Sequence, residues 1–207
     1  MGPHPNPSVF QLLIVDHETA FADAGVPYVQ ALAGEGLLPV EGVELIKLPS
    51  YGRDGHRTIE GPTVAASSDR AALERAFEAL PEKWRLPSSH ALRYGQGSWR
   101  PGSDEPLWAA FVVQSDPVVD ANGVQRVGLV DDGVGVEVIM TREAGERFAE
   151  VSGANVGRKL AIVFNGEVLS DPVIAEAITG GRAVITVGAE PAENEALARA
   201  LKQALER

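Results

Sequence analysis

The sequence predicts an α+β fold with mixed, largely antiparallel sheets and helices packed on them. Its apolar residues occur in short runs bounded by glycine, proline or asparagine, which is typical of strands. Between these runs, other segments carry apolar residues at helical spacing. No run approaches the ~18–20 apolar residues that cross a bilayer, so we expect no membrane insertion by this chain itself.

The N-terminal part is expected to combine strands with short helices. Residues 9–15 form an apolar run and residues 43–48 alternate along the chain, so both are predicted strands. Residues 18–35 show an interrupted helical pattern, in which Pro27 fits the first turn of a helix at residues 28–33.

A loop and a helix are predicted next along the chain. Residues 51–61 hold three glycines and several charges, and are expected to form an exposed loop. Residues 68–80 have an apolar stripe at helical spacing, with Ser67 or Ser68 as the residue that caps the helix.

Residues 95–106 form the best internal boundary, because glycine, proline and serine are frequent there. Residues 107–114 then begin a new strand. Trp99 lies within the boundary stretch and has two interpretations. An exposed tryptophan can anchor a partner protein, or its ring can fold back over the core as a lid.

The most regular part of the chain begins with a predicted helix at residues 144–154, which Asn155 and Gly157 end because both tolerate positive φ. Residues 160–164 follow as a continuous apolar run, short enough for a buried strand.

A hairpin is predicted at Asn165 and Gly166, because both central positions of the favoured two-residue turn need φ > 0. The returning strand, residues 167–174, contains Pro172, which has no N–H to donate. The end of this strand is therefore expected at a sheet edge or a bend.

A glycine pair, Gly180 and Gly181, is predicted to turn the chain into a last strand at residues 183–187. Residues 191–207 are predicted to form a charged amphipathic helix. The apolar stripe of that helix consists of Leu197, Leu201 and Leu205.

Composition and charge exclude several classes of function. The net charge of −11 argues against nucleic acid and against docking on anionic lipid, because both partners need a basic protein surface. The absence of cysteine excludes disulfides and thiolate metal sites, and leaves the cellular compartment open.

Three acidic stretches have simpler interpretations than a metal site. Residues 16–18 (Asp-His-Glu) are adjacent, so side chains at a strand end point to opposite faces and converge poorly. Around Asn122 and Gly123 the spacing of a calcium loop fails, because Leu129 stands where a bidentate glutamate is needed, and a plain turn is expected. Residues 131–133 are predicted to form a hairpin turn.

Residues 88–90 (Ser-Ser-His) place a nucleophile type beside a base type, but adjacent residues are expected not to pair. No catalytic, cofactor-binding or metal-binding residue is predicted. The chain is therefore expected not to be an enzyme and to need no cofactor.

The stretch 145–187 resembles the periplasmic region of SecD, and in particular the head subdomain of the SecDF protein-export subunit. Twenty of about forty positions match the pattern of this family. The matching residues are Gly145, Phe148, Ala149, Asn155, Gly157, Leu160, Ala161, Ile162, Val163, Gly166, Val168, Ser170, Pro172, Val173, Ile174, Ile178, Gly180, Gly181, Ala183 and Ile185. The chain departs from the pattern at Ser152 (Thr), Phe164-Asn165 (Leu-Asp) and Asp171 (Ala). Ser152 and Asn165 keep the hydroxyl and the turn-forming ability, whereas Asp171 introduces a charge.

The resemblance implies a SecD-like periplasmic domain made of a base and a head. Residues 8–105 would form a base-like region that matches the family poorly, and residues 106–188 the head-like subdomain. Residues 189–207 would form a C-terminal amphipathic helix that returns to the base.

The resemblance also implies a non-enzymatic extracytoplasmic module that binds an unfolded or translocating polypeptide, without a membrane motor. The Sec membrane components are further expected partners, and nucleic acid is not. The alternative is a soluble paralogue of the SecD head, recruited as an interaction or assembly protein unrelated to export; an enzyme comes third.

Two compartments are compatible with these functions. The chain would be periplasmic or extracytoplasmic if it is a fragment of a membrane protein or has been trimmed of a signal. It would be cytoplasmic if Met1 is the native start.

The strand at residues 167–174 is the expected polypeptide-binding edge, to which an extended polypeptide would add as another strand. Its candidate contact residues are Val168, Ser170, Pro172, Val173 and Ile174. The other interpretation is that Pro172 and the charge of Asp171 only blunt this edge against aggregation. The residues expected to have a structural role in turns are Asn165, Gly166, Gly180 and Gly181.

Overall fold

The structure is a computed structural model, and it describes residues 9–19, 25–48, 50–51, 57–58, 61–100, 102–130, 133–186 and 191–206. The chain forms two compact units: unit 1 combines the chain up to Ile14 with Pro117–Arg207, and unit 2 is Val15–Asp116. These two units are divided after Ile14 and after Asp116. The base and head subdomains predicted from the sequence, with boundaries after residues 105 and 188, are a different division and stay a prediction.

In unit 1, four strands pair antiparallel in the order β12-β11-β1-β8. Its strands are β1 (Phe10–Ile14), β8 (Val119–Asp120), β11 (Leu160–Phe164) and β12 (Glu167–Ser170). β1 and β11 are both apolar runs, and they pair along their whole length, from Phe10 opposite Phe164 to Ile14 opposite Leu160. The first predicted strand of the chain thus pairs with a strand far along the sequence.

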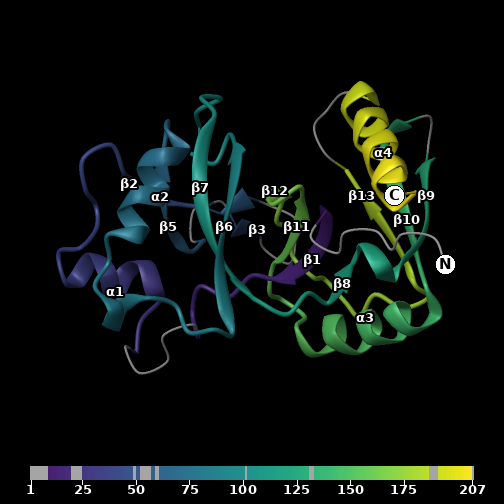
Figure 1. The fold of residues 1–207 in the computed structure, drawn as a ribbon, viewed down its shortest axis with the longest axis horizontal. Helices are drawn as coiled ribbons and strands as arrows, with labels where there is room; N and C mark the ends of the chain where they lie inside the picture. The colour runs from purple at the N-terminus through teal and green to yellow at the C-terminus, as the bar shows by residue number, and fades with distance from the viewer. Residues whose placement is uncertain are drawn as a thin grey trace. The chain divides into compact units, whose positions relative to one another are not determined.

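A second sheet of unit 1 has the order β13-β10-β9. Its strands are β9 (Val124–Val130), β10 (Gly135–Met140) and β13 (Arg182–Ile185), and all pair antiparallel. The helices of unit 1 are α3 (Arg142–Ala154), α4 (Pro191–Leu205) and the short 3₁₀ turn η4 (Ala121–Gly123). α4 runs along this sheet and packs against β9 and β10 (Figure 1).

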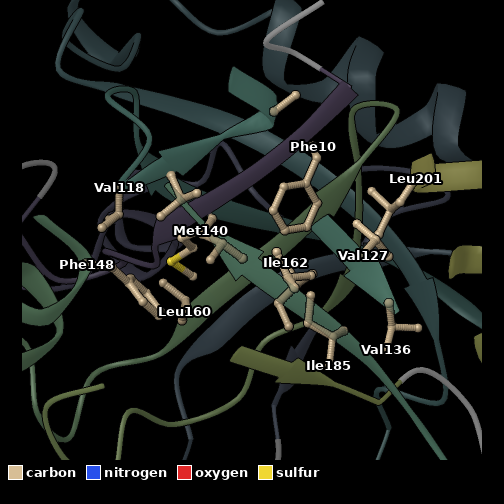
Figure 2. Packing of buried hydrophobic residues seen from close by; sticks show 14 of the residues in the cluster. Phe10, Val118, Val127, Val136, Met140, Phe148, Leu160, Ile162, Ile185 and Leu201 are labelled. Carbon is tan, nitrogen blue, oxygen red and sulfur yellow. The ribbon is translucent and has the colours of Figure 1, made fainter. Parts of the chain in front are cut away.

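Apolar side chains from both sheets and both long helices of unit 1 form one core (Figure 2). Phe10 of β1, Val136 of β10 and Phe148 of α3 are all buried within it. Leu197 and Leu201 of α4 are buried as well, which confirms the predicted apolar stripe. Because each large apolar side chain contributes about 1.5–3 kcal/mol when fully buried, this core is the main source of stability in unit 1.

Unit 2 is built on four strands that pair antiparallel in the order β2-β5-β7-β6. Its strands are β2 (Glu44–Lys47), β5 (Thr63–Ser67), β6 (His90–Gly97) and β7 (Leu107–Gln114). α1 (Tyr28–Gly34) packs on β5, α2 (Arg70–Glu78) packs on β5 and β7, and the short turn η3 is Glu82–Trp84. The buried rings of Tyr28 and Phe77 stack at a centroid distance of 6.3 Å in the core of this unit.

The helices predicted in unit 2 are confirmed, but the cap of α2 differs from the prediction. The carboxylate of Asp69 accepts a hydrogen bond from Ala71 N (3.0 Å) at the start of the helix. Ser67 is the last residue of β5, and its hydroxyl instead donates to Gly42 O (2.6 Å) and accepts from Asp69 N. The strand β5 therefore extends to Ser67, one of the two residues predicted to cap the start of the helix.

The loop predicted at residues 51–61 and the boundary predicted at residues 95–106 both contain more strand than expected. Ser50–Tyr51 (β3) pairs with Arg57–Thr58 (β4), so part of the loop predicted at residues 51–61 is a short ladder. β6 extends to Gly97, which pairs with Leu107 at the start of β7, so residues 95–106 include the end of a strand and the connection of a hairpin.

Trp99 folds back onto the strands from this connection. Its indole N–H donates to Gly95 O (3.0 Å), and its ring meets that of Phe111 edge-on at a centroid distance of 5.2 Å. Of the two interpretations of this residue, the lid is the one observed.

The β11–β12 turn has the predicted backbone, with φ of 50° at Asn165 and 83° at Gly166. Replacing Gly166 with valine is expected to lower the free energy of unfolding by about 1–3 kcal/mol, because a β-branched residue is strained at positive φ. Thermal melts of the two proteins measure this loss.

Asparagine at position 166 is the matched control, because it tolerates positive φ and should retain most of the stability. A Cβ at this position would have no atom within 4 Å, so the two variants differ in backbone strain and not in clashes. An unchanged melting temperature for the valine variant would show that the turn is not required to hold this backbone.

Candidate functional site

The predicted binding segment begins in the β11–β12 hairpin of unit 1. Val163 lies opposite Val168, and Ile162 lies opposite Ser170, so Leu169 is an extra residue in β12. Such a β-bulge bends its strand. The segment therefore changes direction just before the proline that sequence reasoning singled out.

Beyond β12, the chain continues alongside the start of β11. Leu160 N donates to Pro172 O (2.9 Å), and Ile174 N donates to a carbonyl of the segment that precedes β11 (2.8 Å). Main-chain groups alternate in direction along an antiparallel pair. Those of Pro172 and Ile174 therefore face β11, whereas those of Asp171 and Val173 face the opposite way.

This alternation bears on the interpretation of Pro172 as a residue that blunts the edge. The missing N–H of Pro172 lies on the side of β11, since the carbonyl of the same residue is bonded there. Proline at this position therefore removes a donor from the inner ladder and not from the outer side of the strand.

The five predicted contact residues differ in accessibility. Val168 and Ile174 are only 1% and 2% exposed, so their side chains belong to the core and cannot contact a ligand. Ser170 and Val173 are half-buried, and Pro172 is exposed. Binding at this segment stays a prediction, and it concerns these last three residues and the outward main chain between them.

Asp171, the charged departure from the family pattern, forms an ion pair inside unit 1. Lys159 Nζ lies 2.6 Å from Asp171 Oδ2, and the two side chains are only 13% and 12% exposed. Burial raises the pKa of Asp171, and the positive charge of Lys159 partly offsets this rise. The charge is thus neutralised within the fold, and the idea that it repels an added strand loses its basis.

The predicted glycine-pair turn is confirmed, with φ of 87° at Gly180 and 64° at Gly181. α3 approaches this turn closely: a Cβ on Gly145 would lie 2.8 Å from the Cα of Gly181. A hollow of about 290 Å³ opens beside the contact. It is lined by Met140, Thr141, Arg142, Gly145, Glu146, Ala149, Gly180 and Gly181.

Ser152, where the family pattern has threonine, uses its hydroxyl to hold the connection between β12 and β13. The buried hydroxyl accepts a hydrogen bond from Ile178 N (2.8 Å) and donates to Ala149 O (3.3 Å). A residue with a hydroxyl is therefore needed here to satisfy a main-chain donor beside α3.

The expectation that Ser89 and His90 cannot pair is wrong. Ser89 Oγ lies 3.0 Å from His90 Nδ1, and His90 Nε2 lies 3.4 Å from Asp16 Oδ2. Ser89 precedes β6 in a turn, so its side chain is not forced to the opposite face. Asp16 is buried and also accepts hydrogen bonds from the N–H and hydroxyl of Thr19, so this cluster anchors the turn after β1.

The acidic stretches considered as metal sites have structural roles where they are described. Asp120 Oδ1 accepts from Asn122 N (2.9 Å) and Gly123 N (3.2 Å), which makes the expected plain turn. Within the described ranges, no three His, Asp or Glu side chains form a group that could hold a metal ion. Residues 131–132 of the predicted hairpin turn lie outside the described residues.

Sequence reasoning missed a hollow of about 430 Å³ in unit 2. Its lining consists of Tyr28, Glu74, Phe77, Glu78, Arg85, Leu86, Ala91, Leu92 and Tyr94. Burial, followed by the nearby carboxylates of Glu74 and Glu78, raises the pKa of Tyr94 to about 12. No single motif indicates this hollow, because its walls come from α1, α2, β6 and the segment between α2 and β6.

The fold and the hairpin region define the chain as an α+β module built on antiparallel sheets. The sequence model of the family described as SecDF, P1 head subdomain, matches residues 101–205, about half of the 207 residues. The chain belongs to this family, as the matches in the stretch 145–187 indicated.

Curated relatives agree with this assignment. The protein translocase subunit SecDF of Thermus thermophilus is 50% identical over 50 residues, which are 24% of this chain and 7% of that protein. The SecD subunits of Rhodothermus marinus and Magnetococcus marinus are 30% and 37% identical over 129 and 122 residues, or 59% and 58% of this chain. The matches cover only 20% and 22% of those two proteins, so the chain spans less than a quarter of each of these relatives.

Two solved structures of SecDF are similar to this chain at 20% sequence identity. One is described as a membrane component that enhances protein export; it has a TM-score of 0.41, with 95% of this chain and 94% of that chain covered. The other is SecDF in a super-membrane-facing form, with a TM-score of 0.42 and coverages of 99% and 30%. Among the helices that the structure describes, none is both long and apolar enough to span a membrane.

Proposed function

We propose that this chain is a non-enzymatic, extracytoplasmic module that binds an unfolded polypeptide during protein translocation. The match of residues 101–205 to the SecDF P1 head subdomain carries this proposal. The relatives named above are protein translocase subunits, which supports the Sec membrane components as further partners. The sequence resembles the periplasmic region of SecD, and this resemblance supports a position outside the cytoplasm.

A protein that holds many different unfolded chains has to recognise what they share, which is the main chain. Strand addition to a sheet meets this need, because main-chain hydrogen bonds supply affinity without reading the sequence. In the predicted segment, the outward main-chain groups of Asp171 and Val173 and the exposed ring of Pro172 support such a contact. We therefore propose Ser170, Pro172 and Val173 as one polypeptide-contacting region.

The proposal predicts weak binding that depends on the unfolded state of the ligand. Isotopically labelled protein is titrated with a reduced, alkylated polypeptide, and the shifted backbone amides are mapped. We expect shifts within unit 1 and a dissociation constant of about 0.1–1 mM, or roughly −4 to −5.5 kcal/mol.

The folded form of the same polypeptide is the matched control, since it has the same composition but offers no extended main chain. Equal shifts with the folded and the unfolded form would contradict the proposal. An absence of shifts with the unfolded form at about 1 mM, the concentration for a binding free energy near −4 kcal/mol, would do so as well.

A further inference from the structure

The β13-β10-β9 sheet of unit 1 has one face toward the core and a second, outer face. Val136 and Val138 of β10 are fully buried in the core. Side chains alternate between the two faces of a strand, so Glu137 and Ile139 lie on the outer face. The register places Val184 of β13 beside Glu137, and therefore on the same outer face.

The outer face carries more positive than negative charge. Arg182 Nε lies 2.5 Å from Glu137 Oε1, and a guanidinium nitrogen of Arg126 lies 4.0 Å from Glu137 Oε2. The two arginine side chains are 59% and 69% exposed, whereas that of Glu137 is 16% exposed. One carboxylate is thus shared by two exposed cations on a protein whose net charge is −11.

An apolar surface lies next to these charges. Val184 is 52% exposed, which is unusual for a large apolar side chain in a strand. Methyl groups of Val184 and Val130 lie close to Gly135. A Cβ built on Gly135 would lie 2.7 Å from the methyl carbon of Val184 and 3.2 Å from that of Val130. The outer face therefore offers two valines around a glycine, beside a pair of arginines.

The main chain of β13 is available on its outer side. In the part of the chain that the structure describes, β13 is the outermost strand of this sheet. Met140 N donates to Gly181 O, just before β13 (2.8 Å). This bond shows which residues of β13 turn their main-chain groups toward β10, because the direction of these groups alternates along the strand. Ala183 and Ile185 therefore turn their main-chain groups toward β10, and Arg182 and Val184 turn theirs away from it.

We propose that an extended polypeptide segment adds to the outer side of β13 as a further strand. The preferred segment has the pattern acidic-x-apolar. This inference rests on the proposed polypeptide-binding function and deepens it, because it names a second contact site and the class of segment that fits there.

The preferred pattern follows from the spacing of two β13 residues. Arg182 and Val184 are two positions apart, so they share a face, and the residues opposite them in an added strand are also two apart. A carboxylate opposite Arg182 would lie beside the exposed guanidinium group of that residue, and an apolar side chain opposite Val184 would cover its methyl groups. β13 has only four residues, so the contact is short and weak.

Two synthetic peptides of equal length test the preference. Both are extended, and they differ only in Glu-x-Val against Lys-x-Val at the centre. Titrated into isotopically labelled protein at low salt, the glutamate peptide should shift the amides of Arg182–Ile185 and bind about three- to tenfold more tightly. Raising the salt should reduce this difference, because exposed charges are screened.

Two variants test the site itself. Val184→Pro removes an N–H that points away from β10, so the sheet stays paired while peptide binding weakens about tenfold. Val184→Thr retains the N–H and is the matched control, with binding close to that of the original protein. Arg182→Gln is the second variant, and it should abolish the preference for glutamate while the protein keeps its melting temperature within a few degrees.

The outcomes separate this inference from the proposed function. Shifts of Arg182–Ile185 that Val184→Pro abolishes support strand addition at β13. Binding of unfolded polypeptide that moves only residues 170–173 and is unaffected by Val184→Pro overturns strand addition at β13, while the proposed function stands. No shift with either peptide or with unfolded polypeptide at about 1 mM overturns both.

Discussion

Replacing Lys159 with methionine is expected to lower the free energy of unfolding by about 3 kcal/mol at neutral pH. The lysine is the partner of Asp171 at 2.6 Å, and both side chains are nearly buried. Methionine matches the length of the lysine stem, so packing changes little, but the carboxylate of Asp171 remains buried without its cation. Urea denaturation measures the loss.

The loss should depend on pH in a defined direction. Burial already raises the pKa of Asp171 above its ordinary value of 3.8, and Lys159 lowers it in part. Without Lys159 the pKa of Asp171 in the folded state rises further, so the folded variant binds a proton more tightly than the unfolded chain. The contribution of Asp171 to the stability of the variant is then fully present below the pKa of this residue in the unfolded chain. It is lost as the pH rises through the pKa of Asp171 in the folded state.

The double variant Lys159→Met/Asp171→Ala is the control for this mechanism. It removes both charges and introduces the alanine of the family pattern, so it should be within about 1 kcal/mol of the original protein, or more stable. A double variant as unstable as the single one would show that the lysine acts through packing and not through its charge.

The elements that the sequence predicts well are those with local physical causes. The Asn165-Gly166 turn depends on two residues that tolerate positive φ, and it forms where expected. α3 and α4 have apolar stripes at helical spacing, and both stripes pack against the core of unit 1. Such features need no knowledge of what lies across the core.

Features that depend on distant partners could not be predicted from the sequence. The apolar run at residues 9–15 predicts a strand, but nothing local indicates that β11 is its neighbour. Asp171 and Lys159 are twelve positions apart, and only the path of the chain around the hairpin brings them together. The burial of Val168 and Ile174 likewise follows from the core that surrounds them, and it limits the predicted binding edge to fewer residues.

The outer face of the β13 sheet shows the same limitation for a candidate site. Arg126, Glu137 and Arg182 come from three strands, and no motif connects them in the sequence. Their distances become meaningful only once the register of the ladder is known. The charge of the chain as a whole indicates the opposite sign to that of this face.

Gly145→Ala and Gly153→Ala are expected to change stability in opposite directions, although both replace a glycine within α3. Alanine is favoured over glycine in a helix by about 1 kcal/mol, so each replacement gains this amount. At position 145, however, the new Cβ would lie 2.8 Å from the backbone of Gly181, closer than real contacts allow. At position 153, it would lie 3.4 Å from the Cβ of Ala177, which is an ordinary contact.

Because the atom that meets position 145 is backbone, the relief of the clash has to move the glycine-pair turn or α3 itself. Overpacking of this kind costs about 1–3 kcal/mol, and the gain in helix propensity is the same in both variants, so thermal or urea unfolding should place Gly145→Ala about 1–3 kcal/mol below Gly153→Ala. Shifted amides around Gly181 in the first variant and not in the second would locate the strain at the turn that leads into β13. Equal stabilities for the two variants would mean that α3 does not need a glycine to approach this turn, and the close contact would then not explain why the family pattern has glycine at position 145.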